Sequence, residues 1–290
     1  LQLVLDRGQR LDWLDSYEII LEIVIGCCAI YAFLIHSFMA ERPFLDLRLL
    51  ADRNYSFGLL IVLIYGMLNF TPMVVMPPML KGLGGYPEAV IGTLLGGRGV
   101  GAIVGFFFAG RLGRFDPRVG MTIGFGIQTI SGIHMMTFDM NVGMNDVLLA
   151  SFMQGMSVGL IWVPLVIATF ATLDKKVLAE TTAVFHLLRN IGSSIFISIS
   201  VTMVVRTGIS NYARMTEFVS PFNEVLGFPQ YLRFWDIETT AGLARIAVEV
   251  KQQADMIGFL NAFGLYTLAC VVVLPLVWMV RMPKRGAGDE

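Results

Sequence analysis

Long uninterrupted runs of apolar residues dominate the chain, and polar positions collect in the segments between them. A helix needs roughly 20 apolar residues to cross the hydrocarbon core of a bilayer. Seven runs have this length, and each is predicted to be a helix because backbone polar groups must be paired within lipid. The predicted spans are 18–40, 55–79, 87–109, 119–138, 146–172, 183–205 and 256–280.

The composition supports a membrane protein. The 290 residues are 56% hydrophobic and 15% charged, with a net charge of −1, and the mean hydropathy is +0.70. Soluble domains average about 45–50% apolar and about 25% charged residues. The charge balance excludes a nucleic-acid binder, which needs a basic surplus, and the hydrophobicity excludes a disordered chain. A soluble enzyme is disfavoured, and the predicted fold class is all-α integral membrane with seven transmembrane helices.

The distribution of Lys and Arg predicts the orientation. Twelve of them lie in or beside the segments on one side of the predicted spans, against three in the short segments opposite. Because positive charge is enriched in cytoplasmic loops, the C-terminus is predicted to be cytoplasmic and the N-terminus periplasmic. Residues 1–17 then form an exterior loop, 41–54 a cytoplasmic connection, 206–255 a long periplasmic loop and 281–290 a cytoplasmic tail.

Five short motifs point to a known family. They are Leu5-Asp6-Arg7-Gly8, Arg53-Asn54, Arg98-Gly99-Val100-Gly101, Leu188-Arg189-Asn190 and Gln253-Ala254. Each is weak alone, but their order and spacing resemble the C-terminal half of a fourteen-helix drug:proton antiporter of the major facilitator superfamily, of the EmrB/QacA type. The resemblance covers nearly the whole chain and is strongest to EmrB-like multidrug exporters.

The resemblance implies an architecture and a mechanism. The helix at 18–40 would be an accessory inserted helix, and 55–280 would be the C-terminal six-helix bundle. The function implied is proton-coupled efflux of small hydrophobic or amphipathic drugs across the inner membrane by alternating access. A proton gradient would drive it, and no cofactor is expected.

The rest of the transporter is expected to lie outside this chain, which has neither an initiator Met nor a signal sequence at its beginning. The missing N-terminal half would carry the proton, because no Asp or Glu lies deep in the spans from 55 onward, and proton relays within membranes normally use such groups. We therefore expect that this polypeptide alone does not transport.

Arg98 is the residue that most needs an explanation, because a charge near the middle of a span costs about 2.5–3.5 kcal/mol on insertion scales. Two interpretations remain open. Arg98 is either a cavity cation that binds substrate or responds to the proton site, or a structural residue that donates hydrogen bonds to backbone carbonyls. The resemblance places further cavity candidates on neighbouring spans, with ordinary packing as the alternative for each: Asn69, Gln154, Trp162 and His186.

The span that carries Arg98 is rich in glycines four residues apart, a spacing that permits close helix–helix approach. The predicted packing positions are Gly92, Gly96, Gly97, Gly101 and Gly105.

The loop that follows this span contains a second cluster of charges. The family resemblance suggests a cytoplasmic latch, whereas the simpler interpretation is a positively charged anchor. Asp116 is able either to pair with an Arg or to cap a helix. The latch candidates are Arg111, Arg114, Asp116 and Arg118.

Residues 238–254 have apolar positions at helical spacing and predict an interfacial helix before the last span. By resemblance, the exterior segments would contact a periplasmic adaptor and a TolC-like outer-membrane channel; the alternative is a solvated loop.

Other functions have less support. A complete seven-helix receptor or a non-functional truncated remnant stays open, although the last span lacks the Lys that a retinal protein needs. A membrane enzyme or a metal site is not predicted, because His36, His134 and His186 are scattered over three spans.

Overall fold

The computed structural model describes residues 4, 7–8, 11, 13–39, 47–112, 116–220, 222–227 and 235–281, and in this part every regular element is a helix. Four are short 3-10 turns: η1 (Trp13–Asp15), η2 (Leu47–Ala51), η3 (Lys175–Val177) and η4 (Glu224–Gly227). The long helices match the seven apolar runs: α2 (Tyr17–Met39), α3 (Arg53–Gly82), α4 (Glu88–Leu112), α5 (Pro117–Met136), α6 (Met144–Phe170), α7 (Leu178–Thr216) and α9 (Thr240–Met279).

Five described helices are long and apolar enough to cross a membrane: α3, α4, α6, α7 with its η3 turn, and α9. α2 and α5 form where spans were predicted but are not among the five. In α5, Gln128 and His134 lower the mean hydropathy of the apolar run.

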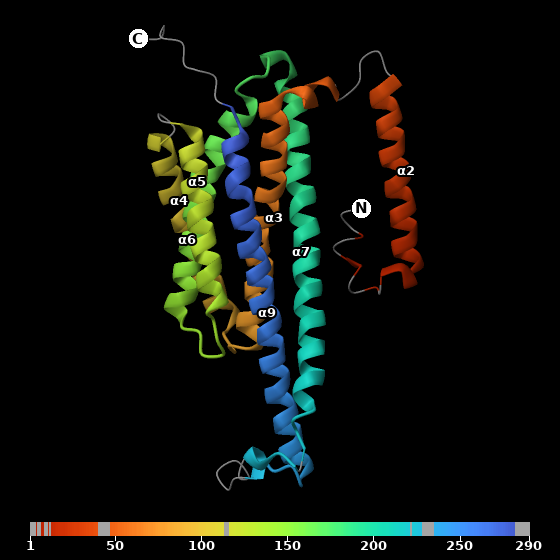
Figure 1. The fold of residues 1–290 in the computed structure, drawn as a ribbon, viewed down its shortest axis with the longest axis vertical. Helices are drawn as coiled ribbons and strands as arrows, with labels where there is room; N and C mark the ends of the chain where they lie inside the picture. Colours follow the sequence, from red (N-terminus) through yellow and green to blue (C-terminus); the bar gives the residue numbers. More distant parts are fainter. Residues whose placement is uncertain are drawn as a thin grey trace.

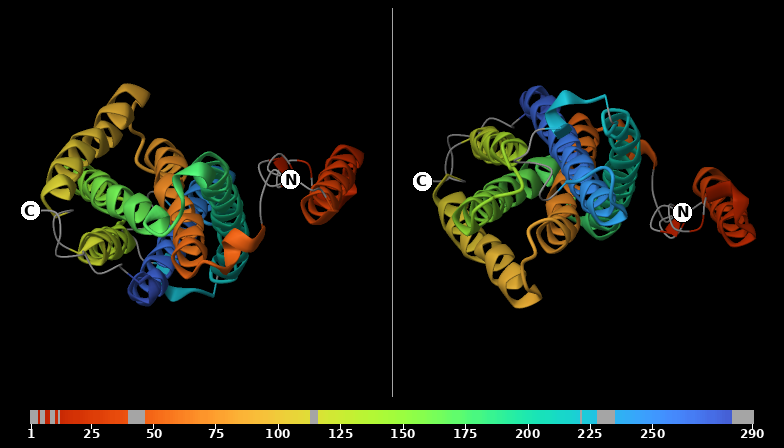
Figure 2. Two further views of the ribbon diagram at one scale, coloured as in Figure 1. Left: turned by 90° about the horizontal axis from the view of Figure 1, so that it is seen from above. Right: turned by 90° about the horizontal axis from the view of Figure 1, so that it is seen from below.

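The helices from α3 onward form one bundle, while α2 stands apart from it beside η1 (Figures 1 and 2). Within the bundle, α3 packs against α6, α7 and α9, and α6 also packs against α4 and α5. α3 buries Tyr55, Ile61, Leu68 and Met76 completely. α3 is therefore the central helix, whereas α4 is held mainly by α6.

Glycines bring α4 and α6 into backbone contact. A Cβ added at Gly101 would overlap the carbonyl oxygen of Phe152, and one at Gly105 would overlap that of Met156. Gly97 faces the side chain of Leu148, 2.6 Å from the position that its Cβ would take.

The contact is reciprocal, because a Cβ at Gly155 of α6 would overlap the carbonyl oxygen of Arg98. Gly92 and Gly96 differ from the prediction: both are exposed, and an added Cβ would meet nothing within 4 Å. The four-residue spacing predicted a shared face, but the rotation of α4 turns these two glycines away from α6.

α7 and α9 form a hairpin that extends beyond the other helices (Figure 1). They have 39 and 40 residues, so each is about 60 Å long, roughly twice the thickness of the hydrocarbon core. Both ends of the predicted loop 206–255 are therefore helical: α7 continues to Thr216, and α9 begins at Thr240.

The predicted interfacial helix 238–254 is likewise the first part of α9 rather than a separate element. Just after this segment, two glycine positions bring α9 close to α7. A Cβ at Gly208 would lie 2.7 Å from Asp255 Oδ1, and one at Gly258 would lie 2.6 Å from the carbonyl oxygen of Val204. The segment thus continues a long helix that packs along α7.

Four consecutive residues at the start of α3, which we call the Asp52–Tyr55 clasp, tie together the ends of three other helices. Asp52 accepts a hydrogen bond from the Tyr55 backbone amide and another from Thr172 Oγ1 after α6, both at 2.8 Å. The Tyr55 hydroxyl donates to the carbonyl oxygen of Thr181 in α7 at 3.1 Å. These bonds fix the beginning of α3 against α6 and α7.

The other two residues of the clasp hold the end of α9. Arg53 Nε donates to the carbonyl oxygen of Met279 at 3.2 Å. Asn54 donates through Nδ2 to the carbonyl oxygen of Arg281 at 2.5 Å and accepts from the Arg281 amide at 2.9 Å. Side chains thus satisfy backbone groups that the end of a helix leaves without partners.

Candidate substrate cavity

Arg98 of α4 reaches across to α3. Its Nη2 donates to both the backbone oxygen and the side-chain Oδ1 of Asn69. Its Nη1 is buried and has no hydrogen-bond partner. The Arg–carbonyl contact agrees with a structural role, and the spare donor agrees with a binding role, so both interpretations of Arg98 remain open.

A cluster of rings lies where α3, α6 and α7 meet. The Trp162 ring of α6 is 5.5 Å from Tyr65, 5.7 Å from Phe185 and 5.9 Å from His186, measured between ring centroids. The guanidinium of Arg189 lies 5.3 Å from the centre of the Trp162 ring, within the range of a cation–π interaction. Trp162 and His186 are therefore brought together as cavity candidates.

Tyr65 connects this cluster to Arg98. It lies one helical turn before Asn69, the residue that accepts hydrogen bonds from Arg98, on the same face of α3. Arg189 Nε, like Arg98 Nη1, is buried without a hydrogen-bond partner. Together these residues form a cluster of rings flanked by two guanidinium groups, in which Tyr65 and Phe185 are buried and Trp162 is partly exposed.

We call this group of residues the Arg98–Trp162 site. Its members are Tyr65, Asn69, Arg98, Trp162, Phe185, His186 and Arg189. Sequence reasoning missed Tyr65 and Phe185. The spacing of Tyr65 from Asn69 was the available signal, whereas Phe185 was indistinguishable from an ordinary core residue.

Gln154 lies elsewhere. Its side chain is almost fully buried, and Nε2 donates to Met135 Sδ at 3.1 Å, at the contact between α5 and α6. The rotation of α6 that points Trp162 toward α3 and α7 turns Gln154 toward α5. Gln154 is therefore a packing residue within this bundle rather than a member of the site.

The charged loop after α4 makes local contacts in the part that is described. Arg111 stacks on Phe107, with its guanidinium 4.2 Å from the ring centre. Asp116 caps α5 by accepting from the Arg118 amide at 2.9 Å, and it also lies 3.9 Å from Arg118 Nε. Arg114 lies outside the described residues. The latch role stays a prediction.

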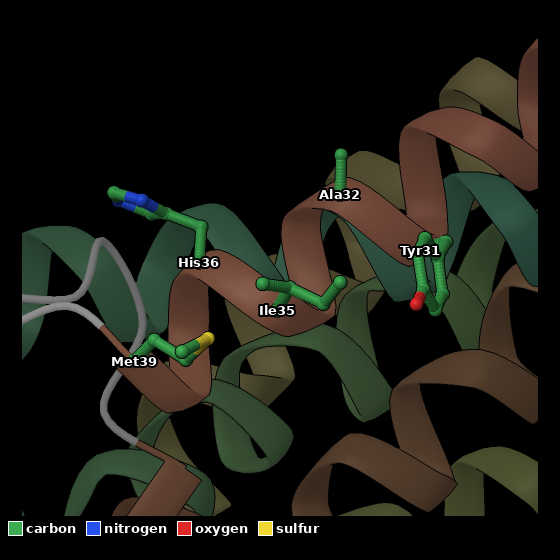
Figure 3. A pocket seen from close by; sticks show the side chains of 5 residues that line it. All are labelled: Tyr31, Ala32, Ile35, His36 and Met39. Carbon is green, nitrogen blue, oxygen red and sulfur yellow. The ribbon is translucent and has the colours of Figure 1, made fainter.

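The described residues contain no group of three or more His, Cys, Asp or Glu side chains that could hold a metal ion. A pocket on α2 is lined by side chains of that helix alone, Tyr31, Ala32, Ile35, His36 and Met39 (Figure 3). It lies on the helix that stands apart from the bundle, so it adds nothing to the Arg98–Trp162 site.

Comparison with known proteins gives a consistent result. No family model matches the chain. It is 28% identical over 291 residues to the multidrug export protein EmrB of Escherichia coli K12, covering 99% of this chain and 57% of that protein. The chain is similar to EmrB over almost its whole length. EmrB of Haemophilus influenzae is 26% identical over 286 residues, covering 98% of this chain and 56% of that protein.

The fatty acid resistance protein FarB of Neisseria gonorrhoeae is also similar, at 26% identity over 293 residues, covering 99% of this chain and 57% of FarB. The predicted resemblance to EmrB-like exporters is thus confirmed over almost the whole chain. With five apolar helices, it also confirms the all-α, multi-pass membrane class and does not favour a receptor. The chain spans little more than half the length of these EmrB and FarB relatives.

Proposed function

We propose that this chain is the C-terminal portion of a proton-coupled exporter of hydrophobic and amphipathic compounds, and that the Arg98–Trp162 site is its share of the substrate cavity. The observation that carries the proposal is the pair of contacts that α3 makes through Asn69 with Arg98 of α4 and through Tyr65 with Trp162 of α6, on three helices that the EmrB resemblance assigns to a central cavity. Similarity to proteins named for multidrug export supports it.

The chemistry of the site suits diverse apolar ligands. Binding pockets for drug-sized molecules have mostly apolar or aromatic walls with a few polar groups that orient the ligand. Here the partly exposed ring of Trp162, backed by the buried rings of Tyr65 and Phe185, would form the wall, and the unpartnered nitrogens of Arg98 and Arg189 would be the orienting donors. Because guanidinium groups bind carboxylates strongly, we expect compounds with an acidic group to be favoured. The name of FarB, a fatty acid resistance protein, agrees with this expectation.

Proton coupling belongs to another part of the transporter in this proposal. The predicted spans from 55 onward contain no Asp or Glu away from their ends. Alternating access then requires a second bundle that rocks against this one about the site, in the inner membrane and with the C-terminus cytoplasmic. A periplasmic adaptor would contact the protruding end of the α7–α9 hairpin.

The experiment compares drug resistance in an efflux-deficient bacterium that expresses the full-length gene or its variants. Arg98→Ala should lower resistance to acidic hydrophobic compounds more than to neutral ones. A charge-assisted hydrogen bond contributes about 1.5–3 kcal/mol, which corresponds to roughly a tenfold or greater loss of affinity. Arg98→Lys keeps the charge without the bidentate geometry, so it should restore resistance only in part.

Arg206→Ala is the matched control, because Arg206 is an exposed cation of α7 away from the site. Uptake into inverted membrane vesicles, measured with and without a protonophore, tests the coupling. Equal resistance of Arg98→Ala and wild type would remove Arg98 from the site. Absence of any proton-dependent transport by the full-length protein would refute the function itself.

A further inference from the structure

A separate pocket lies at the protruding end of the α7–α9 hairpin, far from the Arg98–Trp162 site. Its volume is about 230 Å³, and its lining includes Met215, Phe218, Leu226, Trp235, Ile246 and Glu249. Arg189 and Met215 are 26 positions apart in α7, which places the pocket roughly 39 Å along the helix from the central site. A ligand in one site therefore cannot touch the other.

The pocket is built by the turn that follows α7. Asn223 Nδ2 donates to the carbonyl oxygen of Phe218 at 2.8 Å, and the Asn223 amide donates to the carbonyl oxygen of Ser220 at 3.0 Å. The Leu226 amide in turn donates to the carbonyl oxygen of Asn223 at 3.1 Å. These bonds shape the turn, and α9 contributes Ile246, which is 6% exposed, to the pocket lining.

Glu249 is the single charged side chain among the lining residues. It is half-buried, and its Oε1 accepts from Gln253 Nε2 one turn later at 3.2 Å. Among the described residues no Lys or Arg forms an ion pair with it, since the neighbouring Lys251 pairs instead with Asp255 at 2.9 Å. Among the described lining residues, the pocket thus combines one carboxylate and the Asn223 side chain with apolar and aromatic groups.

We propose that this pocket binds a small amphipathic organic cation, such as an ammonium group attached to one aromatic ring. The cation would lie between the Glu249 carboxylate and the rings of Trp235 and Phe218, since cations are attracted both to anions and to the faces of aromatic rings. Its apolar part would contact Leu226 and Ile246. The site goes beyond the proposed export function, and a volume of about 230 Å³ limits it to ligands smaller than most drugs.

Binding is tested on the purified full-length protein in detergent by isothermal titration calorimetry with benzyltrimethylammonium. Benzylsulfonate, an anion of similar size, is the ligand control. The wild type should bind the cation and not the anion. Glu249→Gln should weaken cation binding about tenfold, equivalent to roughly 1.4 kcal/mol, and Glu249→Asp should retain most of it.

Glu217→Gln is the matched protein control, because Glu217 is an exposed carboxylate at the end of α7 that does not line the pocket. It should bind as the wild type does. Melting temperatures of all variants show whether they are folded. Three results would overturn the site: no cation binding, equal binding of the anion, or equal affinity in Glu249→Gln and wild type.

Trp162→Ala separates the two sites. Loss of cation binding in this variant, with binding intact in Glu249→Gln, would assign the cation to the central cavity and refute the pocket at the hairpin end. Neither result depends on transport, so the export proposal is tested independently of this one.

Discussion

Replacing Gly101 with Ala should destabilise the contact between α4 and α6, whereas the same change at Gly96 should not. Both glycines lie in the interior of α4. At Gly101 the new Cβ would overlap the carbonyl oxygen of Phe152 and lie 2.9 Å from the amide nitrogen of Met156. Both atoms belong to the backbone, so no side-chain rotation relieves the overlap, and the helices must separate.

The separation sets the size of the effect. Restoring ordinary contact requires a shift of about 1 Å, and a gap of 0.5–1 Å forfeits roughly a quarter to a half of the dispersion attraction between facing atoms. The loss extends along the interface, because Gly97, Gly105 and Gly155 share it. We expect a cost of about 1–3 kcal/mol, as for other insertions into well-packed interiors.

At Gly96 the change to Ala is expected to stabilise the protein. An added Cβ meets nothing within 4 Å, and Ala is favoured over Gly inside a helix by about 1 kcal/mol. The assay is thermal unfolding of the purified protein in detergent, with the exposed Cys27 and Cys28 replaced by Ser, followed by a dye that reacts with newly exposed Cys270, which is buried in the folded protein. Gly101→Ala should unfold several degrees below the wild type and Gly96→Ala at or above it. Equal melting temperatures of the two variants would show that the glycine interface is not tight.

Three further changes test the ends of the helices. Asn54→Ala removes both hydrogen bonds to the Arg281 backbone and should destabilise the protein by about 1–3 kcal/mol, the cost of leaving such groups unpaired. Hydrogen exchange at the end of α9 should become faster. Unchanged exchange would contradict the clasp. Asp116→Ala should cost about 1 kcal/mol through the lost helix cap, and Asp116→Asn should recover most of it in thermal unfolding. Tyr86→Phe removes the bond to the Val142 carbonyl oxygen and should cost about 1 kcal/mol, so a melting temperature equal to that of the wild type would argue against this tie between two loops.

The sequence predicted the number, type and approximate position of the long helices, because a span reveals itself by its apolar length. It could not predict how each helix is rotated about its axis. Gly96 and Gly97 are adjacent in sequence, yet one is exposed and the other faces Leu148. Gln154 and Trp162 belong to one helix, and they face different neighbours.

The sequence also did not predict how far α7 and α9 extend. Their outer parts carry Arg206, Arg214 and Glu249, which break the apolar runs, so the sequence indicated a long loop with a separate interfacial helix at 238–254. In the structure these parts are stabilised by packing on each other at Gly208 and Gly258, a tertiary effect that hydropathy does not report. Arg98 was found from sequence because its charge is conspicuous, whereas Tyr65 was not, because buried tyrosines are common in spans.

The Asp52–Tyr55 clasp has a consequence for the time course of biosynthesis. Asn54 is separated from its partner Arg281 by 227 positions, so it waits for roughly 10 to 45 s at translation rates of about 5–20 residues per second. During this interval α3 is present in the membrane, and the backbone segment Met279–Arg281 that it binds has not yet been synthesised. The C-terminal end of α9 thus supplies the last hydrogen-bond partners for the start of α3, the first helix of the bundle. A chain cut before Met279 would insert its apolar helices and leave this end of the bundle open.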